Sequence, residues 1–299
     1  MWPVVDDLAF QADWDQCEQI ARQQGRTFYF ASRCLPKAQR RAILAAYAYC
    51  RIADDIVDTA GERGMDQAMV DLAEWEAQIA NPTHPVAVAF ALVRDEYDIP
   101  VQPVHDLIRG IRMDLTITSY ATWDDLREYC YYVAGTVGLI VAPILGCRNP
   151  EALGDAATLG IAMQLTNILR DVGEDADLGR LYLPLEDIEA FGCTPEGILA
   201  GRPGKGFSRL MAFEISRARA LYAEAHRGFS SLDASGRFTA LMASDLYSRI
   251  LIAIEENNYD VFGQRAHCST TRKLLALPVI SARFMRLSIP VQIAGFLPG

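Results

Sequence analysis

Apolar residues recur every three or four positions along most of the 299-residue chain, which is the spacing of the buried face of an α-helix. No stretch of useful length alternates apolar and polar residues as a half-buried strand does, and no repeat or linker interrupts the pattern. Glycine and proline divide it into segments, because both residues end helices. We therefore predict one all-α domain over residues 1–299. The expected helices cover 6–24, 36–60, 65–80, 86–97, 104–119, a stretch opened by Thr122 and running through 138, 150–175, 195–200, 207–232 and 234–262.

One predicted helix carries polar side chains on the face that should pack against other helices. Gln164, Asn167, Asp171 and Asp175 fall on a single stripe, which continues upstream through small apolar residues. Buried carboxylates are costly unless cations or hydrogen bonds compensate their charge. The stripe therefore predicts a bound cation.

A second predicted helix carries a matching group of acids. Between residues 42 and 58 the only charges are Arg51, Asp54, Asp55 and Asp58, and the two outer aspartates share a face with apolar residues. Two helices that turn carboxylates inward can hold hard divalent cations. Mg²⁺ fits best, with Mn²⁺ as the alternative, because Mg²⁺ takes one or two carboxylates and completes its coordination with water and phosphate oxygens.

Other interpretations of these charges stay open. A lone pair of acids on a helix is often a solvated surface feature. Arg51 could also form structural ion pairs with the aspartates beside it, and Arg170 could pair with Glu174. Neutralising all the inward acids by such pairs alone would be costly. In the functional interpretation Arg51, Arg170 and Arg180 instead bind the phosphate oxygens of a substrate.

Three further places admit both a functional and a structural interpretation. The segment 26–32 either touches phosphate through Arg26 and Thr27 or is an aromatic core connection. Tyr129 is either a catalytic phenol or a packed core residue. Asp114, near the end of a predicted helix, faces either solvent or the interior.

Composition narrows the classes of function. A net charge of −10 argues against nucleic acid as a partner, but a small diphosphate needs only a few cations. Seven cysteines without a C-x-x-C pattern indicate free thiols in a reducing compartment. The first residues lack a basic region, so we expect no secretory signal and a cytoplasmic location. The chain contains no P-loop, G-x-G-x-x-G or G-x-S-x-G motif.

Two segments bear on membrane contact. Residues 129–147 form the longest uncharged run, but its glycines, proline and tyrosines favour a buried core helix over a membrane span. Residues 273–297 are mostly apolar and carry Arg283 and Arg286. We expect this segment either to dock on the bundle or to lie peripherally at the inner face of a membrane. The sequence favours no particular oligomeric state.

Five stretches together resemble the squalene/phytoene synthase family of head-to-head prenyl synthases: 28–36, 47–58, 129–138, 164–184 and 246–262. The resemblance covers nearly the whole chain. It implies a prenyltransferase with the isoprenoid synthase helical bundle and a central apolar cavity. By this resemblance Mg²⁺ would bind Asp54, Asp58, Asn167, Asp171 and Asp175, and diphosphate would bind Arg26, Thr27, Arg51, Arg170, Arg180, Tyr182, Tyr247 and Arg265. The catalytic residues would be Tyr129, Gln164 and Arg51, of which Tyr129 and Gln164 would lie near the reacting carbons.

The resemblance also implies a reaction, in which two identical prenyl diphosphates join through a cyclopropylcarbinyl diphosphate. Stretches 30–36 and 179–188 look most like bacterial phytoene synthases. That similarity implies two C20 geranylgeranyl diphosphates, prephytoene diphosphate as the intermediate, and phytoene as a product formed without NADPH. The alternative is a C15 enzyme that converts two farnesyl diphosphates to squalene, presqualene diphosphate or dehydrosqualene. A non-enzymatic alternative is a scaffold that binds prenyl lipids.

Overall fold

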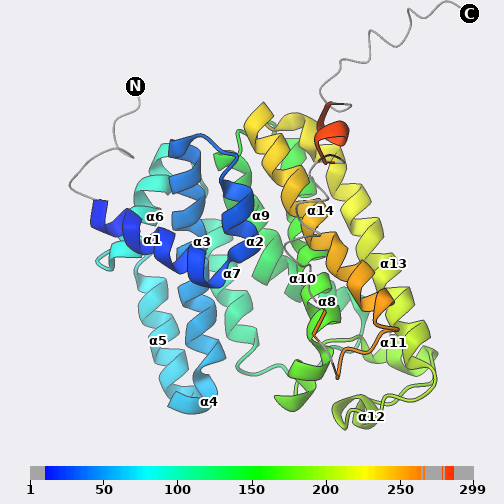
Figure 1. Cartoon of the computed structure of the whole chain (residues 1–299). Coiled ribbons are helices and arrows are strands. Elements are labelled where there is room, and N and C mark those ends of the chain that lie inside the picture. Colours follow the sequence, from blue (N-terminus) through cyan, green and yellow to red (C-terminus); the bar gives the residue numbers. More distant parts are fainter. Residues whose placement is uncertain (1–10, 264, 267–277, 279, 286–299) are drawn as a thin grey trace, which may run out of the picture.

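The computed structural model describes residues 11–263, 265–266, 278 and 280–285, and these residues confirm the all-α class (Figure 1). Within them, pairing of the strand type is confined to one isolated bridge between Ser119 and Leu181. The helices are α1 (Gln11–Gln24), α2 (Arg26–Ser32), α3 (Lys37–Asp58), α4 (Ala60–Arg63), α5 (Met65–Ala77), α6 (Pro85–Glu96), α7 (Gln102–Met113), α8 (Trp123–Cys130), the π-helix η2 (Tyr131–Gly135), α9 (Thr136–Ile144), the 3-10 turn η3 (Pro150–Ala152), α10 (Leu153–Asp177), α11 (Leu185–Ala190), α12 (Pro195–Leu199), α13 (Phe207–Ala225), the 3-10 helix η4 (His226–Ser231) and α14 (Ala234–Glu256).

Local signals in the sequence explain where several helices begin. Thr122 accepts a hydrogen bond from the Asp125 N–H at 3.2 Å, and Asp125 accepts one from the Thr122 N–H at 3.0 Å, so a capping box opens α8. Thr194 caps α12 through the Gly197 N–H at 3.1 Å. Asn149 caps η3, and the chain passes from that turn directly into α10.

The structure corrects two predictions in the first half of the chain. The segment 26–32, for which an aromatic core connection was one of two interpretations, is the short helix α2. The helix predicted over 104–119 ends at Met113. After it the backbone turns to meet the loop that follows α10, where the Leu181 N–H donates to the Thr118 carbonyl at 2.8 Å.

Two corrections concern the second half. The segment predicted as one helix over 207–232 is α13 followed by the tighter helix η4. The helix predicted over 234–262 ends at Glu256. Asn258 and Tyr259 have φ of 53° and 62°, a left-handed conformation in which a right-handed helix cannot continue.

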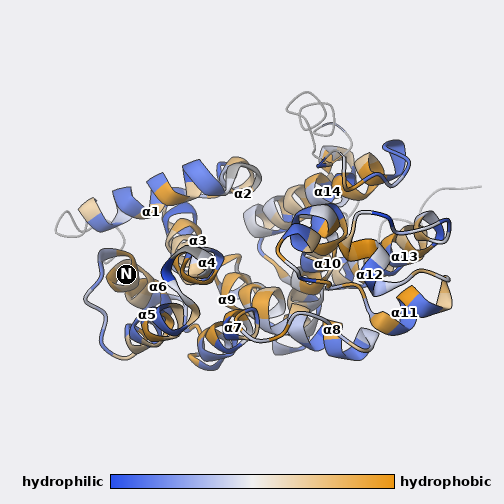
Figure 2. Ribbon diagram, turned by 90° about the horizontal axis from the view of Figure 1, so that it is seen from below, coloured by the Kyte–Doolittle hydropathy of each residue, from blue (hydrophilic) through white to orange (hydrophobic). Residues whose placement is uncertain are grey.

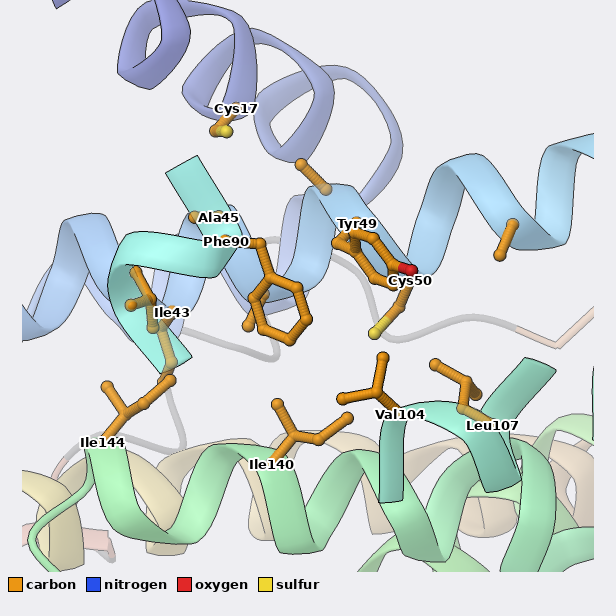
Figure 3. Close-up of a cluster of buried hydrophobic side chains, with 14 of the residues drawn as sticks. Cys17, Ile43, Ala45, Tyr49, Cys50, Phe90, Val104, Leu107, Ile140 and Ile144 are labelled. Carbon is orange, nitrogen blue, oxygen red and sulfur yellow. The ribbon is translucent and has the colours of Figure 1, made fainter. Parts of the chain in front are cut away.

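The buried apolar residues form two clusters, one on each side of the molecule. The first joins α1, α3, α5, α6 and α7 around Tyr49, whose ring stacks on Trp75 at 4.9 Å and on Phe90 at 4.6 Å. Figure 3 shows Tyr49 and Phe90 among the side chains of this cluster. The second joins α8, α10, α11 and α13. Leu159 of α10 packs against both clusters. Seen from below, α1–α7 and α9 form one group of helices and α10–α13 form the other (Figure 2).

Glycine allows the two groups to approach closely where η2 and α9 cross α10. A Cβ atom on Gly138 would lie 2.2 Å from the Ala156 carbonyl oxygen, and one on Gly160 would lie 2.1 Å from the Ala134 carbonyl oxygen. Real side-chain atoms do not approach so closely, so only glycine fits either position. These two glycines therefore let η2 and α9 pack directly on the backbone of α10.

Residues 129–147, predicted to be buried, form the end of α8, all of η2 and α9, and the turn after α9. No helix in the described part of the chain is both long and apolar enough to cross a membrane. Most of the predicted C-terminal segment, 273–297, lies outside the described residues, as do the first residues of the helix predicted over 6–24.

Candidate active site

A cavity of about 890 Å³ opens beside the ends of α3 and α10, between the two core clusters. Val57 and Ile111 of the first cluster line one side, and Ile168 of the second lines the other. The polar part of the lining holds six carboxylates and four guanidinium groups. These are Asp54, Asp58, Asp114, Asp171, Glu174 and Asp175, together with Arg51, Arg170, Arg180 and Arg265.

The last two turns of α3 supply the first acid cluster. Asp54 and Asp58 line the cavity, and Arg51 lies one turn before them. The Arg51 guanidinium donates to Asp55 at 2.5 Å and to Asp58 at 3.3 Å. Its Nε donates to Gln24 at 2.8 Å, which ties α3 to the end of α1. Asp55 itself does not line the cavity and serves as a partner for Arg51.

The last three turns of α10 supply the second cluster. Both oxygens of Asp171 accept hydrogen bonds from Arg170, at 2.7 and 2.5 Å, and both accept from Arg265, at 3.0 Å each. Asn167, one turn earlier, accepts from the Tyr247 hydroxyl of α14 at 2.5 Å and donates to Gln164 at 3.1 Å. The amide side chains are thus held in fixed orientations at the cavity wall.

Burial disfavours the charged form of these acids. It raises the pKa of Asp54 to about 8, although the charge of Arg51 opposes the shift. Burial also raises the pKa of Asp175 to about 7, and the negative charge of Asp171 adds to this effect. The pKa of Asp58 is raised by burial as well. The positive charges of the four arginines therefore neutralise the negative charges of the carboxylates only in part.

Asp114 is a member of this site that sequence analysis left ambiguous. Its two oxygens accept hydrogen bonds from the Tyr129 hydroxyl at 2.9 Å and the Tyr182 hydroxyl at 2.8 Å. Burial raises the pKa of Asp114 despite these two donors. The available signal was its spacing: Leu107 and Ile111, both buried, precede it by seven and three residues and place it on the inward face of α7.

The loop after α10 brings Arg180 into the cavity. Gly179 takes a φ of 72°, a conformation that glycine adopts without steric cost, and the Arg180 N–H returns to the Asp175 carbonyl at 2.8 Å. The Arg180 side chain then donates to the Asp114 carbonyl oxygen at 3.3 Å. Two residues later Tyr182 stacks on Tyr129, with ring centroids 5.4 Å apart.

The acids have the properties of an open site for divalent cations. Six carboxylates exceed four guanidinium groups, and burial holds several of them at raised pKa values, so a dication would relieve their repulsion. Among the described residues, no three His, Cys, Asp or Glu side chains lie close enough to enclose a metal ion. Carboxylate oxygens that line an open cavity suit Mg²⁺, which is usually held by one or two carboxylates and completed by water and phosphate oxygens.

The structure gathers the predicted site residues in one place. All the predicted metal ligands line the cavity, as do Tyr129, Gln164, Tyr182 and the arginines at 51, 170, 180 and 265. Tyr247 reaches the wall through its bond to Asn167. Arg26 and Thr27 begin α2, but their side chains lie outside what the structure describes.

The chain matches a family profile and proteins that are named phytoene synthases. A family profile described as squalene/phytoene synthase matches residues 21–272. A protein called phytoene synthase from Arthrospira platensis is 40% identical over 300 residues, which cover 94% of this chain and 96% of that protein. A 15-cis-phytoene synthase from Synechocystis sp. is 40% identical over 283 residues and covers 89% and 83% of the two chains.

Solved structures resemble the whole bundle. A dehydrosqualene synthase in complex with a ligand superposes with a TM-score of 0.87 at 33% identity and covers 93% of this chain and 98% of that one. A squalene synthase from Alicyclobacillus acidocaldarius gives a TM-score of 0.77 at 30% identity and covers 85% and 97%. The matched residues 21–272 include both acid clusters.

Proposed function

The chain belongs to the squalene/phytoene synthase family, and on that premise we propose that it joins two geranylgeranyl diphosphates head to head to give phytoene, through prephytoene diphosphate. Members of the family are prenyltransferases that use prenyl diphosphates and generally depend on a divalent metal. The observation that carries the proposal is the excess of carboxylates over guanidinium groups in a cavity that Val57, Ile111 and Ile168 also line.

The diphosphates would bind among the two acid clusters. Asp54, Asp58, Asn167, Asp171 and Asp175 would hold Mg²⁺, or Mn²⁺ as the alternative. When bound, the ion would neutralise negative charge that develops on the leaving diphosphate. The arginines would contribute in the same direction, because guanidinium groups match phosphate oxygens in a bidentate manner.

An incoming diphosphate must compete for arginines that already pair with acids. Arg170 and Arg265 both bind Asp171, and Arg51 binds Asp58. We expect phosphate oxygens to replace these carboxylates as partners of the arginines. The same exchange would release carboxylate oxygens to become metal ligands, so binding of metal and of substrate should be coupled.

The reaction begins when the bond between C1 and oxygen of one allylic diphosphate breaks and its electron pair leaves with the diphosphate. A double bond of the second substrate attacks the resulting cation, and proton loss closes the cyclopropane ring. The second diphosphate then leaves, the carbon skeleton rearranges, and another proton is lost. Walls such as Val57, Ile111 and Ile168 would exclude water from these cations.

Tyr129 would serve as a neutral phenol close to the reacting carbons. Burial raises its pKa well above the ordinary value, so it keeps its proton at neutral pH. Its hydroxyl is fixed by Asp114. Gln164 would face the same region, with its amide oxygen held by Asn167. Tyr182 would support this arrangement more than it would touch phosphate, because its hydroxyl is bonded to Asp114.

The two phytoene synthases named above favour the C20 substrate over the C15 alternative. We propose proton loss as the last step instead of hydride transfer, and therefore no NADPH. The product is a hydrocarbon with little solubility in water. This property supports a peripheral location of the enzyme at a membrane surface, and we propose the inner, cytoplasmic face. If deletion of residues 273–299 left vesicle binding of the folded protein unchanged, that segment would have no part in attachment.

Release of diphosphate tests the proposal against a binding scaffold. Purified protein given geranylgeranyl diphosphate and Mg²⁺ should release inorganic diphosphate continuously. EDTA should stop the release, and added Mg²⁺ or Mn²⁺ should restore it. Binding of the prenyl diphosphate without any release would favour the scaffold and contradict the enzyme.

A further inference from the structure

A groove of about 540 Å³ runs between α13 and α14 at the surface of the molecule. Its lining residues on α13 and the first turn of η4 stand at 219, 222, 223 and 226, and those on α14 stand at 241, 248 and 252. At helical spacing each set forms one stripe, so two facing stripes make the walls. None of these residues lines the cavity that holds the acids.

The groove offers apolar surface that is open to water. Ala223, Leu241 and Ile252 line it, and Ile252 is 42% exposed. Single exposed apolar side chains are common on protein surfaces, but Ile252 stands in a concave surface large enough to hold a segment of chain. An occupant that covers Ile252 would remove apolar surface from water, which is favourable.

The charged groups of the groove already have partners. The Arg219 guanidinium donates to both oxygens of Glu255, at 2.8 and 2.6 Å. Arg283 donates to Asp245 at 3.0 Å. An anionic ligand would have to displace these carboxylates, so the groove favours an uncharged occupant with apolar side chains.

The described part of the chain ends at the wall of this groove. Arg283, which lines the groove, belongs to the short helical stretch 280–285. In the same stretch Phe284 packs edge-on against Phe238 of α14, with ring centroids 5.3 Å apart. Figure 1 shows this stretch, in red, beside the beginning of α14. Residues 286–299 therefore continue from a point next to the groove.

The sequence beyond this point has the properties that the groove favours. Residues 287–299 carry no charged side chain, and large apolar side chains stand at 287, 289, 291, 293, 296 and 297. Pro290 and Pro298 disfavour a helix, so an extended path is expected. Asp245, the partner of Arg283, and Ile252 lie seven residues apart along α14, which is about 10 Å. Six extended residues, 286–291, cover about 20 Å and are long enough to reach Ile252.

We propose that residues 286–299 dock, in an extended conformation, in the groove between α13 and α14 and cover Ile252. Grooves lined by apolar side chains are a common way for proteins to bind peptide segments. The covalent connection to Arg283 gives this segment a high effective concentration at the groove, which a second copy of the chain or another protein lacks. A lipid surface is flat on this scale and does not enter a groove. The inference does not depend on the proposed function.

Docking would brace a helix that holds part of the proposed active site. The docked segment would join α13 to α14, and Tyr247 of α14 donates to Asn167 at the wall of the cavity that holds the acids. Ser248, the next residue along α14, lines the groove. A segment far from both acid clusters in the sequence would thus support the position of one predicted metal ligand.

Photo-crosslinking tests which segment covers Ile252. Under ultraviolet light, Ile252→p-benzoylphenylalanine in the full chain should crosslink to a peptide from residues 286–299, identified by mass spectrometry. The matched control is Val101→p-benzoylphenylalanine, because Val101 is 41% exposed and lies just before α7, outside the groove. This control should give no crosslink to 286–299. In a mixture of isotope-labelled and unlabelled protein, the two crosslinked peptides should carry the same label.

Trypsin cleavage after Arg286 gives an independent readout. A docked segment is protected, and cleavage follows the fraction of molecules in which the segment is released. Ile252→Asp places a charge in the groove and should speed the release of peptide 287–299 by at least about fivefold, whereas Val101→Asp should stay within about twofold of the wild type. Circular dichroism checks that both variants fold. If Ile252→Asp does not fold, the crosslinking result decides.

The outcomes are distinct. Crosslinks from position 252 to 286–299 within one chain, with faster cleavage in Ile252→Asp, support the docked segment. Crosslinks between differently labelled chains would show that a second copy covers the groove and would overturn the inference. The absence of any crosslink to 286–299, crosslinks to lipid alone when phosphatidylcholine vesicles are added, or unchanged cleavage of folded Ile252→Asp would also overturn it. Failure to form a C40 product would overturn the proposed function and leave this inference standing.

Discussion

At the scale of single residues, Asp114 connects the two tyrosines of the site. One carboxylate accepts from both Tyr129 and Tyr182, and hydrogen bonds to a charged acceptor contribute more than neutral ones, about 1.5–3 kcal/mol each. Asp114 acts through the tyrosines, so we regard it as a positioning residue. Its place on the inward face of α7 explains why a single acid outside both clusters belongs to the site.

We predict that Asp114→Asn lowers kcat about 10-fold to 100-fold, in line with the loss of about 1.4–2.8 kcal/mol of orientation. The KM for geranylgeranyl diphosphate should change much less, because both carboxylate oxygens of Asp114 already accept hydrogen bonds from the two tyrosines. Steady-state kinetics of Asp114→Asn, Tyr129→Phe and the double variant measure the coupling. Fully additive losses in kcat would contradict a positioning role.

The acid clusters give a second prediction at this scale. Asp58→Asn should reduce turnover by at least about 100-fold while hardly changing the free energy of unfolding, because the Asp58 side chain is 56% exposed. Asp171→Asn should reduce turnover as strongly but also destabilise the fold, because two arginines donate to this carboxylate. Turnover assays and urea unfolding of both variants check this difference. Near wild-type turnover in both would refute the metal site.

The sequence was sufficient to identify most of this chemistry. Two groups of acids among apolar residues, each at helical spacing, predicted a shared site, and the structure brings them to one cavity. The sequence alone could not show which carboxylate forms an ion pair with which arginine. It offered Arg170 with Glu174, whereas the fold pairs Arg170 with its neighbour Asp171, and that choice depends on where Arg265 and the end of α10 lie.

At the scale of elements, the position of α10 against η2 and α9 fixes the site. Its polar stripe faces the cavity only because Gly138 and Gly160 let backbones touch. The Gly160 position therefore carries information about packing, while Gly154, near the start of the same helix, has no atom within 4 Å of where its Cβ would be.

We predict opposite effects for two glycine substitutions in α10. Gly160→Ala should destabilise the protein by about 1–3 kcal/mol, since the added methyl group meets the Ala134 carbonyl and the backbones must separate. Gly154→Ala should stabilise it by up to about 1 kcal/mol, because alanine has the higher helix propensity and meets no neighbour. Urea unfolding followed by circular dichroism measures both. A neutral Gly160→Ala would contradict the close contact.

A buried ion cluster holds the elements around the loop of Arg180. Arg217 of α13 donates to Glu214 at 2.7 Å and to Asp187 of α11 at 2.9 Å, and its guanidinium lies 4.4 Å from the centre of the Trp123 ring of α8. Glu214 is fully buried, and burial raises its pKa to about 7. The cluster therefore joins three helices at a point where an unpaired charge would be costly.

We predict that Arg217→Ala costs about 3–5 kcal/mol of stability at pH 8, because the buried Glu214 must then either stay ionised without its partner or take up a proton that the unfolded chain does not bind at this pH. The cost should be smaller at pH 6, because Glu214 can then take up a proton. The matched change Arg219→Ala removes an exposed pair with Glu255 and should cost at most about 1 kcal/mol at either pH. Equal costs for the two variants would contradict this picture.

Element boundaries were predicted less well than element types. The predicted ends of α7 and α14 were wrong because apolar residues continue at helical spacing beyond both helices. Leu115 follows α7 and Val261 follows α14. Both side chains are buried in the core, although they belong to turns and not to helices. Tertiary contacts, such as the backbone bond between Leu181 and Thr118, end α7. The spacing of apolar residues cannot predict this contact, because Leu181 lies more than sixty residues after Thr118 in the sequence.

At the scale of the whole molecule, the protein consists of two core clusters with the acid-lined cavity between them. We propose that the chain folds as one domain, because Leu159 of α10 packs against both clusters and the cavity takes its walls from each.

The raised pKa values predict how stability depends on pH. The unfolded chain releases the protons of Asp54 and Asp175 near the ordinary value of 3.8, whereas the folded chain keeps them until about pH 8 and about pH 7. The folded state therefore binds more protons between these limits, so metal-free stability should fall as pH rises from about 4 to 8. Thermal unfolding in EDTA across this range measures the trend.

Mg²⁺ should reverse that trend, because it binds the deprotonated acids. The rise in melting temperature on adding Mg²⁺ should be larger at pH 8.5 than at pH 6, and Asp54→Asn should flatten the difference. A Mg²⁺ effect that is largest at pH 6 would show that these acids do not bind the metal.

The identity of the product tests the central claim most directly. Purified protein with Mg²⁺ should be given geranylgeranyl diphosphate or farnesyl diphosphate, each with and without NADPH, and the extracts analysed by mass spectrometry. We predict a C40 hydrocarbon from the C20 substrate, formed equally well with and without NADPH. A C30 product from farnesyl diphosphate, with no C40 product from the C20 substrate, would contradict the assignment and place the enzyme among the C15 synthases.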